Sequence, residues 1–434
     1  MIRKAALLFA CAVFAPNASA QEMLNGRYNL TLTTGGTTLY GMLELEQKGE
    51  TLSGKYRGSD LTGSRHGDQV TFVARDKDGD SSEVRLTLKG RILTGSETQS
   101  DATGHGTTYL PVSIVAEPIP AVTSPLPKRH EFSPTAFHRA FSAANKPVLT
   151  IAPGDTVHTT TVDAGGVDEK NVAHALGGNP ETGPFYVAGV VPGDTLAIHI
   201  VRLKLNRDWA VSDDYLVRDA VNPGLAVTMK DTGKTIYWHL DRSKGIATPE
   251  KPDVHLRNYA VPLRPMLGCV AVAPPPAFAA PNTGDSGFYG GNMDFNEITE
   301  GTTVYLQARV PGGLVYIGDG HAAMGDGELN GNGLETSMDV EFQVEVLPNR
   351  PTPSPRVEND RQIMALGYEG SLNEALRTAT SNMQRWLASD YALNPSEASQ
   401  VIGTAAHIRI SEAADRNAGV ALILDKDVLK TLTK

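Results

Sequence analysis

The chain is dominated by short runs in which apolar and polar residues alternate, separated by turns rich in Gly, Asp and Pro. Tyr28, Leu30 and Leu32 alternate with polar residues, and residues 84–88 repeat the pattern. A period of two residues is typical of β-strands with one buried face, whereas helices need apolar residues every three to four positions. Together with 43 Gly and 27 Pro, this pattern predicts a mainly β protein with many turns.

The length of 434 residues is sufficient for two or three domains. After residues 1–20, the pattern of residues 21–116 predicts a small N-terminal antiparallel β sandwich or barrel. This module has no cluster of His or carboxylate residues suited to catalysis or metal binding. Residues 117–134 contain five prolines and predict a stiff linker. A larger β-rich domain is expected from 135 to 350, and a C-terminal helical segment that packs on it from 351 to 434.

The larger domain and the C-terminal segment differ in their periodicity. The C-terminal segment has a capping box at 371–374 and a second helix start at 394–397, and this second helix is expected to contain His407. A lone histidine there is expected at the surface or in packing rather than as a ligand. Strand candidates in the larger domain are residues 148–151, 195–200, 304–306 and 340–346.

The first twenty residues have the features of a secretory signal peptide. Basic residues at 3–4 precede an apolar run at 5–15, and Ala-Ser-Ala at 18–20 gives a small-residue cleavage site. We therefore expect a periplasmic or secreted protein that begins near Gln21. The apolar run is about half the ~20 residues that a membrane span requires, so no membrane span is predicted.

The two cysteines have different expected fates. Cys11 would leave with the signal peptide, and the alternative of lipid attachment at Cys11 would place the bulky Phe9 in the cleavage site. Cys269 would then remain alone, so no internal disulfide is expected. Its apolar surroundings predict a buried strand, in which a thiol behaves as a small hydrophobic group.

The formal net charge of −10, without long runs of either sign, argues against binding to nucleic acid. Nucleotide-dependent and serine-nucleophile mechanisms are also disfavoured. The sequence Gly-Asp-Ser-Gly at 284–287 matches a serine-protease loop over four residues but has no matching His and Asp context. Gly-x-Ser-x-Gly and phosphate-binding Gly-x-x-x-x-Gly-Lys patterns are absent from the sequence.

The densest group of polar residues suited to chemistry lies between 290 and 335. Asp319 and His321 are two positions apart, so in an extended strand both side chains would point to one face and could bind one metal ion. Gly-Asp-Gly stretches are also common turns, and this alternative stays open. A calcium loop beginning at Asp326 is disfavoured, because Ser337 stands where a bidentate Glu is required.

Several blocks, in order along the chain, resemble the acetamidase/formamidase family. The resemblance extends over about residues 135–430, and the N-terminal β module lies outside it. The blocks are residues 153–157, 161–164, 179–184, 192–196, 266–274, 290–298 and 318–328.

The resemblance implies a β-rich, metal-dependent hydrolase that splits a short amide into a carboxylate and ammonia. It assigns a divalent metal, zinc with calcium as an alternative, to Asp294, Asp319 and His321. The metal would activate a water molecule, and Glu328 or Asp163 would transfer its proton to the leaving nitrogen.

We further expect Asn292 and Gly291 to bind the substrate, with a small amide as the partner and a homodimer as a possible assembly. The competing function is a non-catalytic exported β protein that binds a small molecule and carries a structural metal. A different metal-assisted hydrolase on the same scaffold is a third, because a fold does not fix a reaction.

Overall fold

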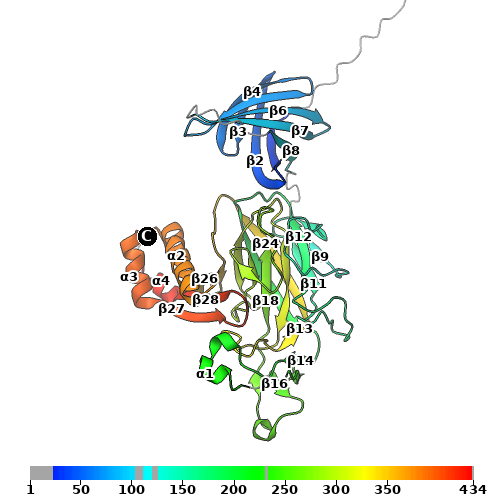
Figure 1. Ribbon diagram of the computed structural model, residues 1–434, viewed down its shortest axis with the longest axis vertical. Coiled ribbons are helices and arrows are strands. Elements are labelled where there is room, and N and C mark those ends of the chain that lie inside the picture. The colour runs from blue at the N-terminus through cyan, green and yellow to red at the C-terminus, as the bar shows by residue number, and fades with distance from the viewer. Residues whose placement is uncertain (1–22, 103–110, 120–125, 230–232, 433–434) are drawn as a thin grey trace, which may run out of the picture.

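The computed structural model describes residues 23–102, 111–119, 126–229 and 233–432, and strands far outnumber helices in it (Figure 1). The predicted signal peptide at 1–20, including Cys11, lies outside these residues. The prediction of a mainly β fold is confirmed. None of the helices in the described ranges combines the length and apolar character that crossing a membrane requires.

The N-terminal strands form a closed antiparallel barrel, one of the two predicted arrangements (Figure 1). Each strand pairs with the next, and the first pairs with the eighth. Alternate side chains such as Leu30, Leu43 and Leu93 point inward and are fully buried. The strands are β1 (Gly26–Thr34), β2 (Thr37–Lys48), β3 (Thr51–Tyr56), β4 (Ser59–His66), β5 (Gln69–Arg75), β6 (Ser81–Lys89), β7 (Ile92–Ser100) and β8 (Val112–Pro118).

A nine-stranded sheet forms one layer of the larger body. Its longest strand, β13, pairs with β21 on one side and β24 on the other. In spatial order the strands are β27 (His407–Glu412), β28 (Ala418–Asp425), β26 (Gln362–Glu369), β25 (Arg356–Glu358), β21 (Thr303–Gln307), β13 (Thr195–Leu205), β24 (Met338–Leu347), β11 (Thr156–Thr160) and β9 (Arg129–Glu131).

An eleven-stranded sheet forms the other layer and shares one apolar core with the first. Its strand β18 is buried along its whole length, as expected for a continuous apolar run covered on both faces. The spatial order is β17 (Val261–Pro262), β16 (Ile246–Pro249), β15 (Ile236–Asp241), β14 (Trp209–Ser212), β23 (Glu335–Thr336), β22 (Val315–His321), β18 (Met266–Val272), β20 (Gly290–Asn292) and β19 (Ser286–Gly287), with β10 (Leu149–Ile151) and β12 (Thr182–Val187) joined through β22.

The predicted strand candidates correspond to β10, β13, β21 and β24. Cys269 lies fully buried in β18 as a free thiol, as predicted. Within the predicted linker, residues 120–125 lie outside the described part, and β9 pairs in parallel with β11, so the body begins earlier than expected.

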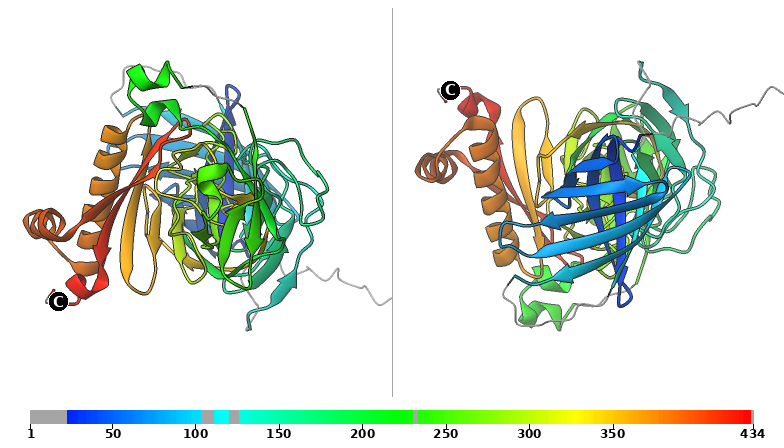
Figure 2. Two further views of the ribbon diagram at one scale, coloured as in Figure 1. Left: turned by 90° about the horizontal axis from the view of Figure 1, so that it is seen from below. Right: turned by 90° about the horizontal axis from the view of Figure 1, so that it is seen from above.

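The C-terminal segment contains the two predicted helices, α2 (Leu372–Tyr391) and α3 (Pro395–Ala405), followed by the short α4 (Lys426–Leu429). Helix α2 packs against β26 and β28 (Figure 2). Its buried residues Ala375, Ala379 and Met383 belong to the apolar cluster that it shares with these strands. The same segment also provides strands β25 to β28 of the nine-stranded sheet, which were not predicted. The expectation that His407 lies on the second helix is wrong, because α3 ends at Ala405 and His407 opens β27 at the surface.

Candidate metal centre

The pairing of β18 with two neighbours brings distant polar residues together. Strand β18 pairs with β20 on one side and with β22 on the other. Asp294 lies two residues after the end of β20, and Asp319 and His321 lie at the end of β22. Glu335 begins β23, which pairs with β22, and Glu328 lies in the loop between these two strands. The metal ligands predicted from the sequence therefore meet in one place.

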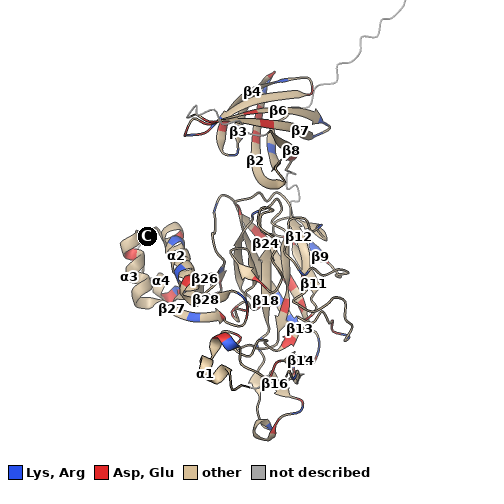
Figure 3. Cartoon of the chain, in the orientation of Figure 1, with Lys and Arg blue, Asp and Glu red and all other residues tan. Residues whose placement is uncertain are grey.

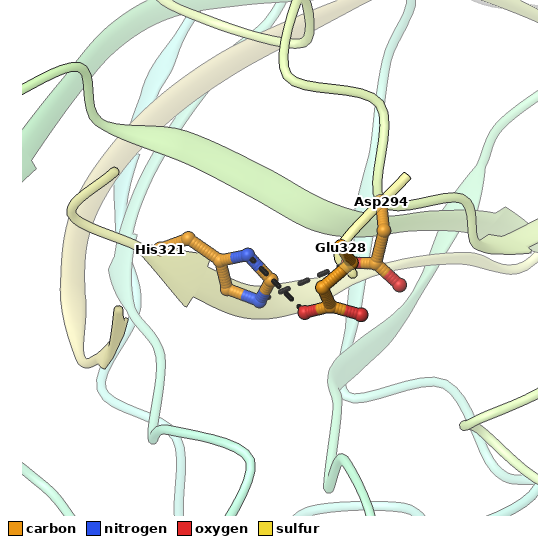
Figure 4. A group of neighbouring side chains, drawn as sticks. All are labelled: Asp294, His321 and Glu328. Atoms are coloured by element: carbon orange, nitrogen blue, oxygen red, sulfur yellow. Dashed lines mark ion pairs between the residues drawn. The ribbon is translucent and has the colours of Figure 1, made fainter. Parts of the chain in front are cut away.

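His321 is at the centre of this group. Its Nε2 lies 3.1 Å from Glu335 Oε1, 3.4 Å from Asp319 Oδ2 and 3.7 Å from Asp294 Oδ1. Its Nδ1 lies 3.9 Å from Glu328 Oε1, and Figure 4 shows Glu328 and Asp294 directed at the imidazole. Two sets of ligand atoms lie close enough to bind an ion, namely Asp294 with His321 and Glu328, and Asp319 with His321 and Glu335.

A third set extends the group toward the C-terminal hairpin. The ligand atoms of Asp294, Glu412 and Asp415 lie within 4.8 Å of one another. The amide of Asn292 donates to Asp294 Oδ2 at 2.6 Å and to Asp415 Oδ2 at 2.7 Å. Asn179 Nδ2 in turn donates to Asn292 Oδ1 at 3.0 Å. Asn292 thus orients two carboxylates, and its predicted contact with substrate stays a prediction.

The backbone is unusual at three of the acidic positions. Asp294, Asp319 and Glu328 have positive φ values of 38°, 51° and 49°. Non-glycine residues rarely adopt this region, and such strain persists where surrounding contacts impose it, often at functional sites. The Asp294 amide donates to the Gly268 carbonyl at 3.2 Å, and Asp319 lies within β22, which pairs with β18.

The carboxyl groups are buried close to one another, which makes their ionised forms unfavourable without a cation. Burial, together with nearby carboxylates, raises the pKa of Asp294 well above its ordinary value. Burial likewise raises the pKa of Glu335 and of Glu412 to about 7, and of Asp415 to about 6. Burial lowers the pKa of His321, but the charges of Glu335 and Asp319 outweigh it and raise that pKa overall.

Buried carboxylate oxygens that lack a hydrogen-bond partner indicate whether this group suits a cation. Figure 3 shows acidic and basic residues interspersed along the elements. At this site, by contrast, Asp294, Asp319, Glu328 and Glu335 lie in ligand sets that share His321. A buried polar atom without a partner is unfavourable, and one cation would satisfy several of these oxygens at once. The donor set therefore fits a divalent cation. Among the described residues, the oxygens that accept no hydrogen bond include Asp294 Oδ1, Asp319 Oδ1, Glu335 Oε2 and Glu412 Oε2.

The structure does not bring Asp163 into this group. Its Oδ2 accepts from Arg207 Nη2 at 2.6 Å, and its Oδ1 accepts from the Val167 amide at 2.9 Å. Arg207 also donates to the backbone carbonyl of Glu335 at 3.2 Å and lies 3.5 Å from the ring centroid of Trp209. Asp163 therefore holds Arg207 against the strand that carries Glu335.

We expect Arg207→Gln to lower the free energy of unfolding by about 3–5 kcal/mol, because Asp163 would remain buried without its counter-ion. The Arg207 and Asp163 side chains are 1% and 4% exposed. Urea unfolding measures the effect. Arg416→Gln is the control, because its contact with Asp285 is 3.5 Å and Arg416 is 79% exposed, so little change is expected. Equal small effects in both variants would contradict the structural role of Arg207.

Several residues of the site were not among the predicted ligands. Glu335 closes the polar stretch noted in the sequence, and its position was the available signal. Glu412 ends strand β27 and Asp415 follows it, in a segment that was expected to be helical. Glu181 is fully buried beside β22, where a Cβ at Gly318 would lie 2.1 Å from its Oε2. No local pattern marks these last three acids.

Gly291 has a backbone role in the structure. Its φ is 97°, and a Cβ there would lie 2.3 Å from the Asp285 carbonyl oxygen across the β19–β20 pair. Its predicted contact with substrate stays a prediction.

A family model, a curated protein and solved structures all show similarity to acetamidases or formamidases. The model of the Acetamidase/Formamidase family matches residues 281–357, which include Asp294, Asp319, His321, Glu328 and Glu335. An acetamidase from Bacillus halodurans is 28% identical, with a TM-score of 0.59 over 70% of this chain and 100% of that chain. A predicted acetamidase/formamidase from Thermoanaerobacter tengcongensis is 26% identical, with a TM-score of 0.60 over 70% of this chain and 98% of that chain.

A curated relative is a candidate formamidase of Schizosaccharomyces pombe. It is 24% identical over 216 residues, which are 39% of this chain and 52% of the relative. The chain therefore spans about half the length of the curated relative that it matches.

Proposed function

Because this chain belongs to the acetamidase/formamidase family, we propose that it is an amidohydrolase that converts a linear amide and water into a carboxylate and ammonia. The observation that carries the proposal is the buried group around His321. Its carboxylates lie within the span that the family model matches, and several of their oxygens have no hydrogen-bond partner among the described residues.

The binding of a divalent cation is assigned to Asp294, Asp319 and His321, with Glu335 beside His321 as an added ligand. Zinc is the proposed ion because it accepts mixed carboxylate and imidazole ligands, whereas calcium prefers oxygen ligands alone. A cation bound there would polarise the amide carbonyl and lower the pKa of water.

The proton transfers are assigned to Glu328. Its Oε1 accepts from the Gly333 amide at 2.6 Å, which fixes the carboxyl group beside His321. Burial raises the pKa of Glu328, so this group can both accept a proton from water and donate one to the amide nitrogen. Protonation of that nitrogen is required for ammonia to leave. Asn292 holds Asp294 and Asp415 in place during these steps.

Ammonia release from purified protein tests the proposal. We expect formamide or acetamide to yield ammonia, and dialysis against a chelator to reduce the rate at least about tenfold and the melting temperature by at least about 5 °C. Zinc should restore both more effectively than calcium. A chelator already saturated with metal is the control. Full activity in metal-free protein would refute the metal-dependent mechanism, and amide binding without ammonia release would favour the non-catalytic binding protein.

Removal of the N-terminal barrel is expected to leave hydrolysis of a small amide within about threefold of the full-length rate. The barrel has its own apolar core. Its contacts with the body include Tyr40, which packs against the apolar core of the body, and the 3.4 Å bond from Arg27 Nη2 to Gly189 O. The shortened chain must keep β9 and Lys128, because the Lys128 amide donates to Asp155 Oδ1. Loss of folding, measured by circular dichroism, would show that the barrel is integral.

We also propose that the protein is exported to the periplasm or secreted, on the basis of the signal-peptide features at residues 1–20. Mass spectrometry of the exported protein should find an N-terminus near Gln21. An intact Met1 would exclude cleavage. A homodimer stays a prediction.

A further inference from the structure

A cavity of about 810 Å³ lies beside the metal centre. Met324 and Gly333 form part of its lining. Met324 Sδ lies 3.3 Å from His321 Nδ1, and the Gly333 amide donates to Glu328 Oε1. A Cβ at position 333 would lie 2.3 Å from His321 Nδ1. Two lining residues of the cavity are therefore in direct contact with His321 and Glu328 of the centre.

An aromatic pair forms one side of this cavity. The rings of Trp238 on β15 and Tyr259 are 6.1 Å apart and inclined by 63°, an edge-to-face arrangement. Trp238 Nε1 donates to Ser212 Oγ at 2.9 Å, which fixes the indole. Leu256 and Tyr259 also line the cavity and remain 44% and 46% exposed. Apolar side chains left exposed together indicate a surface that a ligand covers.

The cavity is larger than a two-carbon amide requires, and its apolar lining offers contacts that such a small amide cannot make. Sites of about 300–1,000 Å³ typically enclose drug-sized ligands, with apolar and aromatic walls and a few polar groups. Ile236, Pro249 and Leu334 extend the apolar wall of this cavity. Formamide or acetamide would leave the Trp238–Tyr259 wall without contacts.

We infer that the substrate is a primary amide that carries an aromatic ring, bound with the ring against Trp238 and Tyr259 and the amide group toward His321 and Glu328. This inference rests on the proposed amidohydrolase function and names its substrate class. Met324 both lines the cavity and contacts His321, and its flexible thioether can move to admit the amide group.

The test compares phenylacetamide with acetamide as substrates of the metal-loaded, full-length protein. We expect kcat/KM for phenylacetamide to be at least about 30-fold higher, because burial of the ring adds apolar contacts that acetamide lacks. Equal or lower kcat/KM for phenylacetamide, with acetamide hydrolysed, would overturn the inference and leave the proposed function intact.

Variants of the aromatic wall test whether Trp238 and Tyr259 cause the preference for phenylacetamide. Trp238→Ala and Tyr259→Ala should each lower the ratio of the two kcat/KM values about tenfold. Tyr237→Ala is the matched control, because Tyr237 is the next residue on β15, is 53% exposed and does not line the cavity. Circular dichroism and melting temperatures establish that each variant is folded. An unchanged ratio in folded Trp238→Ala and Tyr259→Ala would overturn the inference.

Binding measured without turnover separates this inference from the proposed function. Phenylacetamide should quench a tryptophan fluorescence signal that the Trp238→Phe substitution removes. If this quenching occurs but neither amide releases ammonia, the ring site is supported and the hydrolase proposal fails. Light scattering reports whether the wall instead covers a second copy of the chain. A change of oligomeric state in Tyr259→Ala, with the ratio unchanged, would overturn the inference.

Discussion

Replacing His321 with Ala is expected to reduce kcat/KM at least about a hundredfold and to remove bound metal. The imidazole Nε2 lies within 3.7 Å of carboxylate oxygens of Glu335, Asp319 and Asp294, so it is the common member of two ligand sets. Loss of groups that merely support a ligand typically costs 10–100-fold, and loss of the ligand itself should exceed this. Metal content measured by mass spectrometry and ammonia release together report the effect.

His407→Ala is the control for this variant. His407 begins β27 and is exposed, and no shared ligand set includes it among the described residues. We expect it to keep metal content and turnover. A His321→Ala protein that is folded, retains its metal and turns over normally would exclude His321 from the centre.

The alternating strands of the barrel could be predicted because one face of each strand is buried and the other is in water. Leu30, Leu43 and Leu93 point inward as their spacing requires. Strand β28 could not be distinguished in this way. Its run is apolar along both faces, because α2 covers one side and the body the other, and such a run fits a buried helix or a buried strand equally well.

The candidate site could be predicted where its residues are close in sequence, as with Asp319 and His321. Glu412 and Asp415 could not be predicted, because the β27–β28 hairpin brings them to Asp294 from more than a hundred positions away. Asp163 illustrates the opposite limit. A carboxylate is a suitable metal ligand, but the sequence does not reveal that the Asp163 carboxylate is paired with Arg207.

Gly268→Ala is expected to lower activity by about a hundredfold and to destabilise the protein by about 1–3 kcal/mol, although the change adds a single methyl group. A Cβ at this position would lie 2.3 Å from Asp319 Oδ2 and 2.4 Å from Asp294 Oδ1, so both carboxylates must move. The backbone cannot yield easily, because β18 is paired on both edges and the Gly268 carbonyl accepts from the Met293 and Asp294 amides. Metal affinity, turnover and thermal unfolding measure the effect.

Gly403→Ala is the control, because a Cβ on this exposed position of α3 meets nothing within 4 Å. Alanine there should stabilise the helix by up to about 1 kcal/mol without altering turnover. If Gly268→Ala binds metal as tightly as the unaltered protein, the two carboxylates are not held in the geometry that metal binding requires.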